Sequence, residues 1–117
     1  MTAATIWVTF QLPGIHCYPD APDAVAYLRS PHRHLFHFKV SVEVTHDNRD
    51  IEFHLLLNTL RGLYADGTLQ LDHKSCETIA RELLARVVNM YPNRAIAVAV
   101  SEDGECGAEI TYTGDAL

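Results

Sequence analysis

The strongest constraint on the fold is a strand-like run from His34 to Thr45. Every even position from Phe36 to Val44 is apolar, and the odd positions between them are polar or charged. This alternation has the period of a β-strand, whose successive side chains point to opposite faces. One covered face and one wetter face is typical of an antiparallel sheet.

Three further segments alternate with the same parity, with their apolar residues at even positions. The pattern predicts strands at Thr5–Leu12, Ala95–Ser101 and Ala108–Thr113. The residues Ser101-Glu102-Asp103-Gly104 favour a turn, so the last two strands are expected to form a hairpin.

Between the two strand pairs the apolar period becomes that of a helix. One stripe contains Phe53, Leu56, Leu57, Leu60 and Tyr64, and Asp66-Gly67 is expected to end it; the second contains Ile79, Leu83, Val87 and Met90. Ser75 or Asp72 can cap the second helix. The predicted fold is therefore α+β: an antiparallel four-stranded sheet with two helices packed on one face, in the order ββααββ, as a single domain over residues 1–117.

The charge balance limits the classes of partner. Fifteen acidic residues against nine basic ones give a formal charge of −6, which argues against general binding to nucleic acid or to a membrane surface. Without a bilayer-spanning apolar run or a signal-peptide pattern, we expect a cytoplasmic protein. The three cysteines are an odd set without C-x-x-C spacing, which argues against a disulfide framework. Four strands leave two open sheet edges, so a homo-oligomer is expected.

Histidines supply the sharpest chemical signal. His32 and His34 lie two apart on a predicted strand and therefore point to one face, roughly 6 to 7 Å apart at Cα. Two imidazoles on an apolar face are costly to bury unless each has a partner, and a zinc ion serves both. The alternative is that strand-end histidines bond to loop carbonyls. His16, just past the first strand, could add a third ligand or be an exposed loop residue.

Two acidic positions are also candidates. Asp72 next to His73 could set the tautomer of a general acid or base, although Asp72 is equally explained as a helix cap. Glu102 extends an apolar strand face with a carboxylate. It is either a surface residue or an anchor for paired N–H donors of a ligand.

Five short motifs follow one another on the predicted elements. They are His32-Arg33-His34-Leu35-Phe36, Ile51-Glu52-Phe53, Leu71-Asp72-His73, Ser75-Cys76-Glu77 and Val98-Ala99-Val100-Ser101-Glu102-Asp103. In this order the chain resembles the superfamily of 6-pyruvoyl-tetrahydropterin synthase and 6-carboxy-tetrahydropterin synthase, whose architecture is called the tunnelling fold. The similarity runs from Phe10 to Tyr112.

The resemblance implies a set of roles. Zinc would be held by His16, His32 and His34, and would act as a Lewis acid on a dihydropterin. Asp72 and His73 would transfer protons, Glu102 would grip the pterin amino and ring N–H groups, and Ser75 and Glu77 would contact the substrate. The subunits of such proteins assemble into barrels with active sites at the interfaces, which agrees with the expected oligomer.

Three departures separate this chain from the family pattern. Leu28 occupies the position of the family's catalytic cysteine, which lies four residues before the H-x-H pair. His16 follows Phe10 at a longer spacing than usual, and only Lys74 replaces a long loop before Ser75. Cys17, beside His16, is the candidate substitute base.

Two functions follow from these residues. The first is a zinc-dependent lyase of the 6-carboxy-tetrahydropterin synthase type, acting on 7,8-dihydroneopterin triphosphate in a pterin or 7-deazaguanine (queuosine) route. The second is a catalytically degenerate protein that binds a pterin-, purine- or nucleotide-like ligand without turnover. Leu28 favours the binder, whereas the H-x-H pair and Asp72-His73 favour the enzyme.

Overall fold

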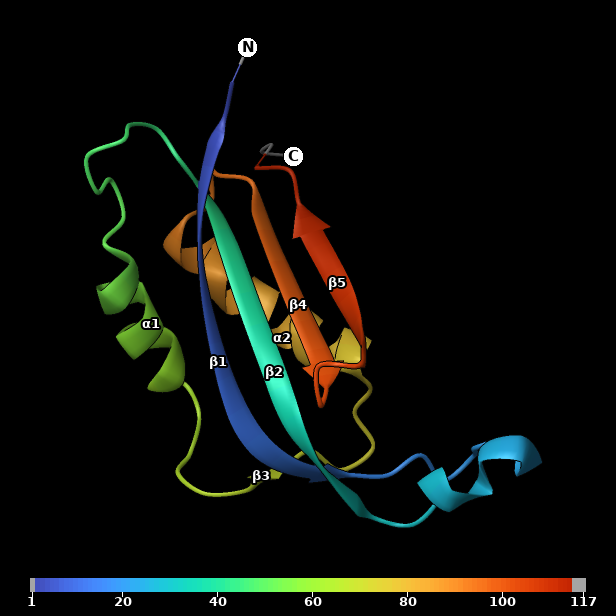
Figure 1. The fold of residues 1–117 in the computed structure, drawn as a ribbon. Helices are drawn as coiled ribbons and strands as arrows, with labels where there is room; N and C mark the ends of the chain where they lie inside the picture. Colours follow the sequence, from blue (N-terminus) through green and yellow to red (C-terminus); the bar gives the residue numbers. More distant parts are fainter. Residues whose placement is uncertain (1, 115–117) are drawn as a thin grey trace.

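The computed structural model describes residues 2–114 as a sheet covered on one face by two helices (Figure 1). The strands are β1 (Ala4–His16), β2 (His32–Val44), β3 (Leu69–Gln70), β4 (Ile96–Glu102) and β5 (Cys106–Tyr112). The helices are α1 (Phe53–Arg61) and α2 (Cys76–Met90), and a short 3-10 helix, η1, spans Asp23–Leu28.

The sheet has five strands in the order β3-β1-β2-β4-β5, and not the four that were predicted. The four long strands pair antiparallel as expected, but β3 pairs parallel to β1 through Gly14 and Ile15, so the sheet is mixed. A two-residue strand cannot display a period, which is why alternation did not reveal it. The α+β class itself is confirmed.

Strand β1 continues four residues beyond its predicted end and carries His16 into the sheet. Its register with β2 is unbroken from Ala4 opposite Val44 to His16 opposite His32. The extension passes through Gly14, where an added Cβ would lie 2.7 Å from Leu71 Cδ1 and 2.8 Å from Phe36 Cδ2. Glycine therefore permits the close packing at this end of β1. The long connection from β1 to β2 therefore begins at residue 17.

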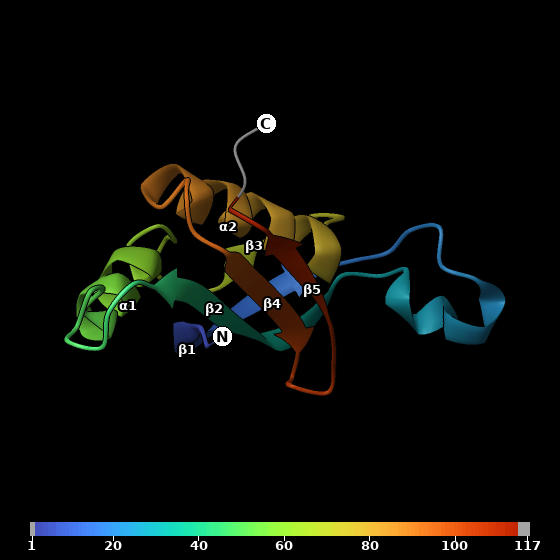
Figure 2. The same cartoon turned by 90° about the horizontal axis from the view of Figure 1, so that it is seen from above.

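The core lies between the even-numbered face of the sheet and the two helices. Phe10 of β1 and Phe38 of β2 stack with their ring centroids 4.8 Å apart, and both are fully buried. Helix α2 covers β4 and β5 while α1 packs against β1, so both helices lie on the same face (Figure 2). The parity of the apolar residues thus identified the covered face correctly.

Each helix begins at a capping side chain. Glu52 Oε1 accepts the amide hydrogen of His54 (2.8 Å) at the start of α1, and Ser75 Oγ accepts that of Thr78 (3.2 Å) at the start of α2. Asp72 does not cap α2; its φ of 53° places it in a left-handed turn. Helix α1 ends at Arg61, earlier than its apolar stripe suggested.

The connection between β1 and β2 projects from one end of the sheet, at the same end as the β4–β5 turn (Figure 1). Tyr18 N donates to Leu28 O (2.8 Å) where the connection leaves and rejoins the sheet. The connection contains the short 3-10 helix η1. Within residues 2–114, no helix has the length and apolar character required to cross a membrane.

Candidate metal centre

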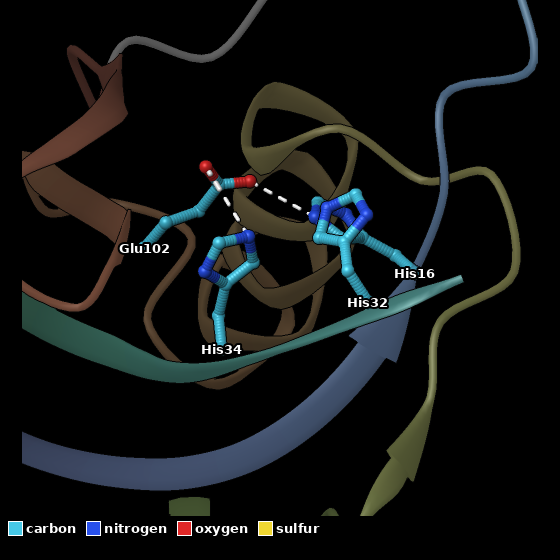
Figure 3. A group of neighbouring side chains, drawn as sticks. All are labelled: His16, His32, His34 and Glu102. Atoms are coloured by element: carbon cyan, nitrogen blue, oxygen red, sulfur yellow. Dashed lines mark ion pairs between the residues drawn. The ribbon is translucent and has the colours of Figure 1, made fainter. Parts of the chain in front are cut away.

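Three histidines and one glutamate converge where the connection leaves the sheet (Figure 3). His16 is the last residue of β1, His32 and His34 begin β2, and Glu102 ends β4. One ligand atom from each lies within 4.8 Å of the others. Register explains the convergence, because His16 pairs with His32, and Glu102 pairs with Phe36, two residues beyond His34 on the same face.

Hydrogen bonds fix the tautomer of all three rings. The Nδ1 atom of His16 lies 2.9 Å from Lys74 O, that of His32 lies 2.9 Å from Ser30 O, and that of His34 lies 2.8 Å from Asp103 Oδ2. Carbonyl and carboxylate oxygens only accept hydrogen bonds, so each Nδ1 must carry the hydrogen. Each neutral ring therefore presents the lone pair of its Nε2.

The three Nε2 atoms are buried and have no hydrogen-bond donor. The rings meet edge to face with centroids 4.7 to 5.3 Å apart, and Glu102 Oε2 lies 2.9 Å from His16 Nε2. Buried acceptors facing one another are unfavourable without a positive group between them. A divalent cation meets this requirement, and imidazole nitrogens with a carboxylate oxygen are ligands that zinc accepts. The residues present therefore fit the implied metal.

Asp103 supports this cluster from behind and was missed by sequence reasoning. Its Oδ2 accepts the Nδ1 hydrogen of His34, while its Oδ1 accepts the amide hydrogen of Leu35 (2.9 Å). The hydrogen bonds from Leu35 and His34 hold the pKa of Asp103 below its usual range. A carboxylate behind a ligating histidine orients the ring and raises its basicity. In the sequence, Asp103 belongs to a predicted turn and to the last of the five motifs, and neither pattern indicates a contact with His34.

A cavity of about 530 Å³ opens beside the cluster. Its walls come from the end of β1, the connection, the start of α2 and the β4–β5 hairpin. Seven of the predicted site residues line it, namely His16, Cys17, His32, His73, Ser75, Glu77 and Glu102. The volume is typical of a pocket for a small organic ligand. His34 and Asp72 are not among the lining residues.

Of the candidate proton-transfer residues, Cys17 and His73 line the cavity and Asp72 does not. Cys17 is half-buried, and its amide donates to Asp72 O (2.9 Å), which ties it to the loop before α2. Asp72 and His73 are both exposed, and no hydrogen bond among the described residues joins the carboxylate of one to the ring of the other. The pairing expected from their adjacency is therefore not formed within this chain.

Leu28 lies in the cavity wall together with Cys17, although 11 positions separate them in the sequence. Cys76 and Cys106 also line the cavity, which their sequence positions did not suggest. Burial raises the pKa of the Cys76 thiol to about 11, so this group stays protonated at neutral pH. Cys76 is therefore poorly suited to act as a base.

Comparison with known proteins identifies the fold. Neither protein-family models nor curated protein sequences give a match. Solved structures of 6-pyruvoyltetrahydropterin synthase are similar over almost the whole chain. The Plasmodium vivax protein, in a variant of a catalytic glutamate, gives a TM-score of 0.71 at 15% identity, and the Plasmodium falciparum protein gives 0.70 at 14%. Each comparison covers 97% of this chain and 99% of the other.

This likeness confirms the fold that the five motifs predicted. At such low identity it concerns the arrangement of the backbone and not the chemistry of individual residues. The chemistry must be argued from the residues of the site.

Proposed function

We propose that this chain is a zinc-dependent enzyme of the 6-carboxy-tetrahydropterin synthase type that acts on 7,8-dihydroneopterin triphosphate. The observation that carries the proposal is the set of three buried Nε2 lone pairs beside a cavity of ligand size. Zinc bound there would act as a Lewis acid toward the side-chain hydroxyls of a dihydropterin. A fold shared with pterin synthases supports the choice of substrate class.

In this proposal Cys17 Sγ accepts the proton taken from the substrate side chain. Cys17 follows the metal ligand His16 directly and lines the cavity, so a positive charge nearby would favour its thiolate. His73, also in the cavity wall, would hold or release the second proton. Ser75 and Glu77, at the start of α2, would contact the substrate.

Glu102 lies beside the cluster and in the cavity wall. Its carboxylate would accept hydrogen bonds from the amino and ring N–H groups of a bound pterin, which are donors of matching geometry. Such a contact would orient the ring relative to the histidine cluster.

We further propose that the chain is a homo-oligomer. In the described part of the chain, two sheet edges pair with no other strand: the edge of β5 that faces away from β4, and the edge of residues 4–13 of β1 that faces away from β2. Open edges of this length favour pairing with another copy. The exposed Asp72 and His73 would then face a neighbouring subunit. Light scattering at micromolar concentration tests this arrangement, and a monomer would contradict it.

The second candidate function is a binding protein without turnover, and one observation favours it. Leu28 lines the cavity where the family pattern has its catalytic cysteine, and an aliphatic side chain cannot accept a proton. The candidates differ only in whether Cys17 supplies the missing base.

Mass spectrometry after incubation with zinc and 7,8-dihydroneopterin triphosphate separates the two candidates. For the enzyme we expect a product from the parent protein, none from Cys17→Ala, and a product from Cys106→Ala, which removes another cavity thiol. Zinc and pterin binding should survive in Cys17→Ala. Binding of the pterin by the parent protein without any product would favour the binder.

A further inference from the structure

We propose that Glu102 is the fourth protein ligand of the metal when no organic ligand is bound. The cluster would then be a closed site of three histidines and one glutamate. The resemblance implies only three histidines, with Glu102 reserved for the pterin. This inference rests on the proposed metal site but not on the identity of the substrate.

The first argument concerns the contact between Glu102 Oε2 and His16 Nε2, which are 2.9 Å apart. Because Lys74 O fixes the hydrogen of His16 on Nδ1, both atoms at this contact are acceptors. A proton shared between them would relieve this one contact. It would leave the buried Nε2 atoms of His32 and His34 without a partner. A cation at the centre satisfies all four groups together.

The second argument concerns the orientation of the whole carboxylate. Its other oxygen, Oε1, lies 3.7 Å from His34 Nε2, so both oxygens face the histidines. Among the described residues no lysine or arginine forms an ion pair with Glu102. The Glu102 side chain is 29% exposed and borders the cavity, so water is accessible to it, yet it points to the cluster (Figure 3). A metal ion accounts for that orientation.

A fourth protein ligand changes how the site would work. Zinc with four protein ligands is tetrahedral and closed, whereas catalytic sites keep a position open. A substrate hydroxyl could reach the metal only after Glu102 leaves. Because Glu102 also borders the cavity, its carboxylate can turn from the metal to the N–H donors of an incoming ligand. Ligand binding and opening of the metal site would then be one event.

Cobalt(II) in place of zinc tests the coordination directly, because its visible absorption responds to added ligands. We expect azide to leave the spectrum of the cobalt-loaded parent protein unchanged, since no position is open. In Glu102→Ala, azide should bind and shift the spectrum. Glu102→Gln should weaken zinc binding by about tenfold or more. Glu105→Gln, in the exposed turn of the same hairpin, is the matched control and should behave as the parent does.

The parent protein alone can overturn the proposal, whether or not the variants fold. If azide binds to its cobalt form and shifts the spectrum, a coordination position is open and Glu102 is not a ligand. That result would leave the three-histidine site intact. A parent protein that binds neither cobalt nor zinc would overturn the metal site itself, and with it the proposed function.

Discussion

Strand β2 carries a polar cluster at each end, and the two clusters differ in how their hydrogen-bonding groups are matched. Just past the C-terminal end of β2, Asp50 Oδ2 accepts hydrogen bonds from Arg94 Nη1 (2.6 Å) and from both the amide and the hydroxyl of Thr45 (2.8 and 2.9 Å). Arg94 also donates to Glu43 O (3.2 Å). Donors and acceptors there pair within the chain.

The histidine cluster at the start of β2 lacks such a match. Its three Nε2 atoms and the Glu102 carboxylate are all acceptors, and the described residues bring no donor to the Nε2 atoms. Both clusters are polar groups at the ends of a buried strand face. The Asp50 cluster is therefore complete as folded, whereas the histidine cluster has unmatched acceptors that could hold a metal ion. A mismatch of donors and acceptors therefore distinguishes the candidate site from the Asp50 cluster, whereas polarity alone does not.

The largest expected effect is on metal content after His34→Ala. The parent protein should contain about one zinc ion per subunit, and the variant essentially none, because one of two ligands held by β2 is lost. Added zinc should raise the melting temperature of the parent but not of the variant, since only a bound ion stabilises the fold. Elemental analysis and thermal denaturation measure the two effects.

His37→Ala is the matched control for this experiment. His37 lies on the same strand three residues further along and points to the opposite face. Its variant should retain the metal. Loss of zinc from both variants would mean that the metal depends on histidine content and not on the cluster, and a parent protein free of zinc would refute the site.

A smaller effect is expected from Asp103→Asn. The variant preserves size and tolerates the left-handed φ of 57°, but its amide no longer provides the carboxylate that accepts from His34 Nδ1. Zinc affinity should fall by about 10- to 100-fold, as for other partners behind metal-ligating histidines. Competition with a chelating dye measures it. Asp47→Asn, an exposed position at the other end of β2, should leave the affinity unchanged; equal losses in both would contradict the role of Asp103.

Sequence periodicity was sufficient for most of the fold. Parity alone identified the four long strands, the covered face of the sheet, and His32 with His34 as neighbours on that face. It missed β3, which is too short to show a period, and the extension of β1 through Gly14 to His16. Both features depend on contacts between the end of β1 and residues 69–71, which are far apart in the sequence.

The candidate site was predictable in its residue types but not in its connections. The resemblance named three histidines and Glu102, yet the contact of Glu102 with His16 depends on the register of three strands. Asp103 reaches His34 across 69 positions from a turn with positive φ. No local pattern encodes such a contact, because it arises only when β2 and β4 pair.

The smallest effect is expected in the Asp50 cluster, where Asp50 accepts hydrogen bonds from Arg94 and Thr45. Asp50→Asn should lower the melting temperature, and this loss should be independent of metal. The hydrogen bond from Arg94 and those from Thr45 hold the pKa of Asp50 well below its usual range. A carboxyl with a lowered pKa in the folded state stabilises the fold above its unfolded pKa of about 3.9, and loses that contribution as the pH falls further. The difference in melting temperature between parent and variant should therefore be largest near neutral pH and shrink below about pH 4.

Thermal denaturation with a chelator present measures this difference without any contribution from the histidine cluster. A difference that persisted unchanged into acid would mean that the Asp50 charge is not what stabilises this end of β2.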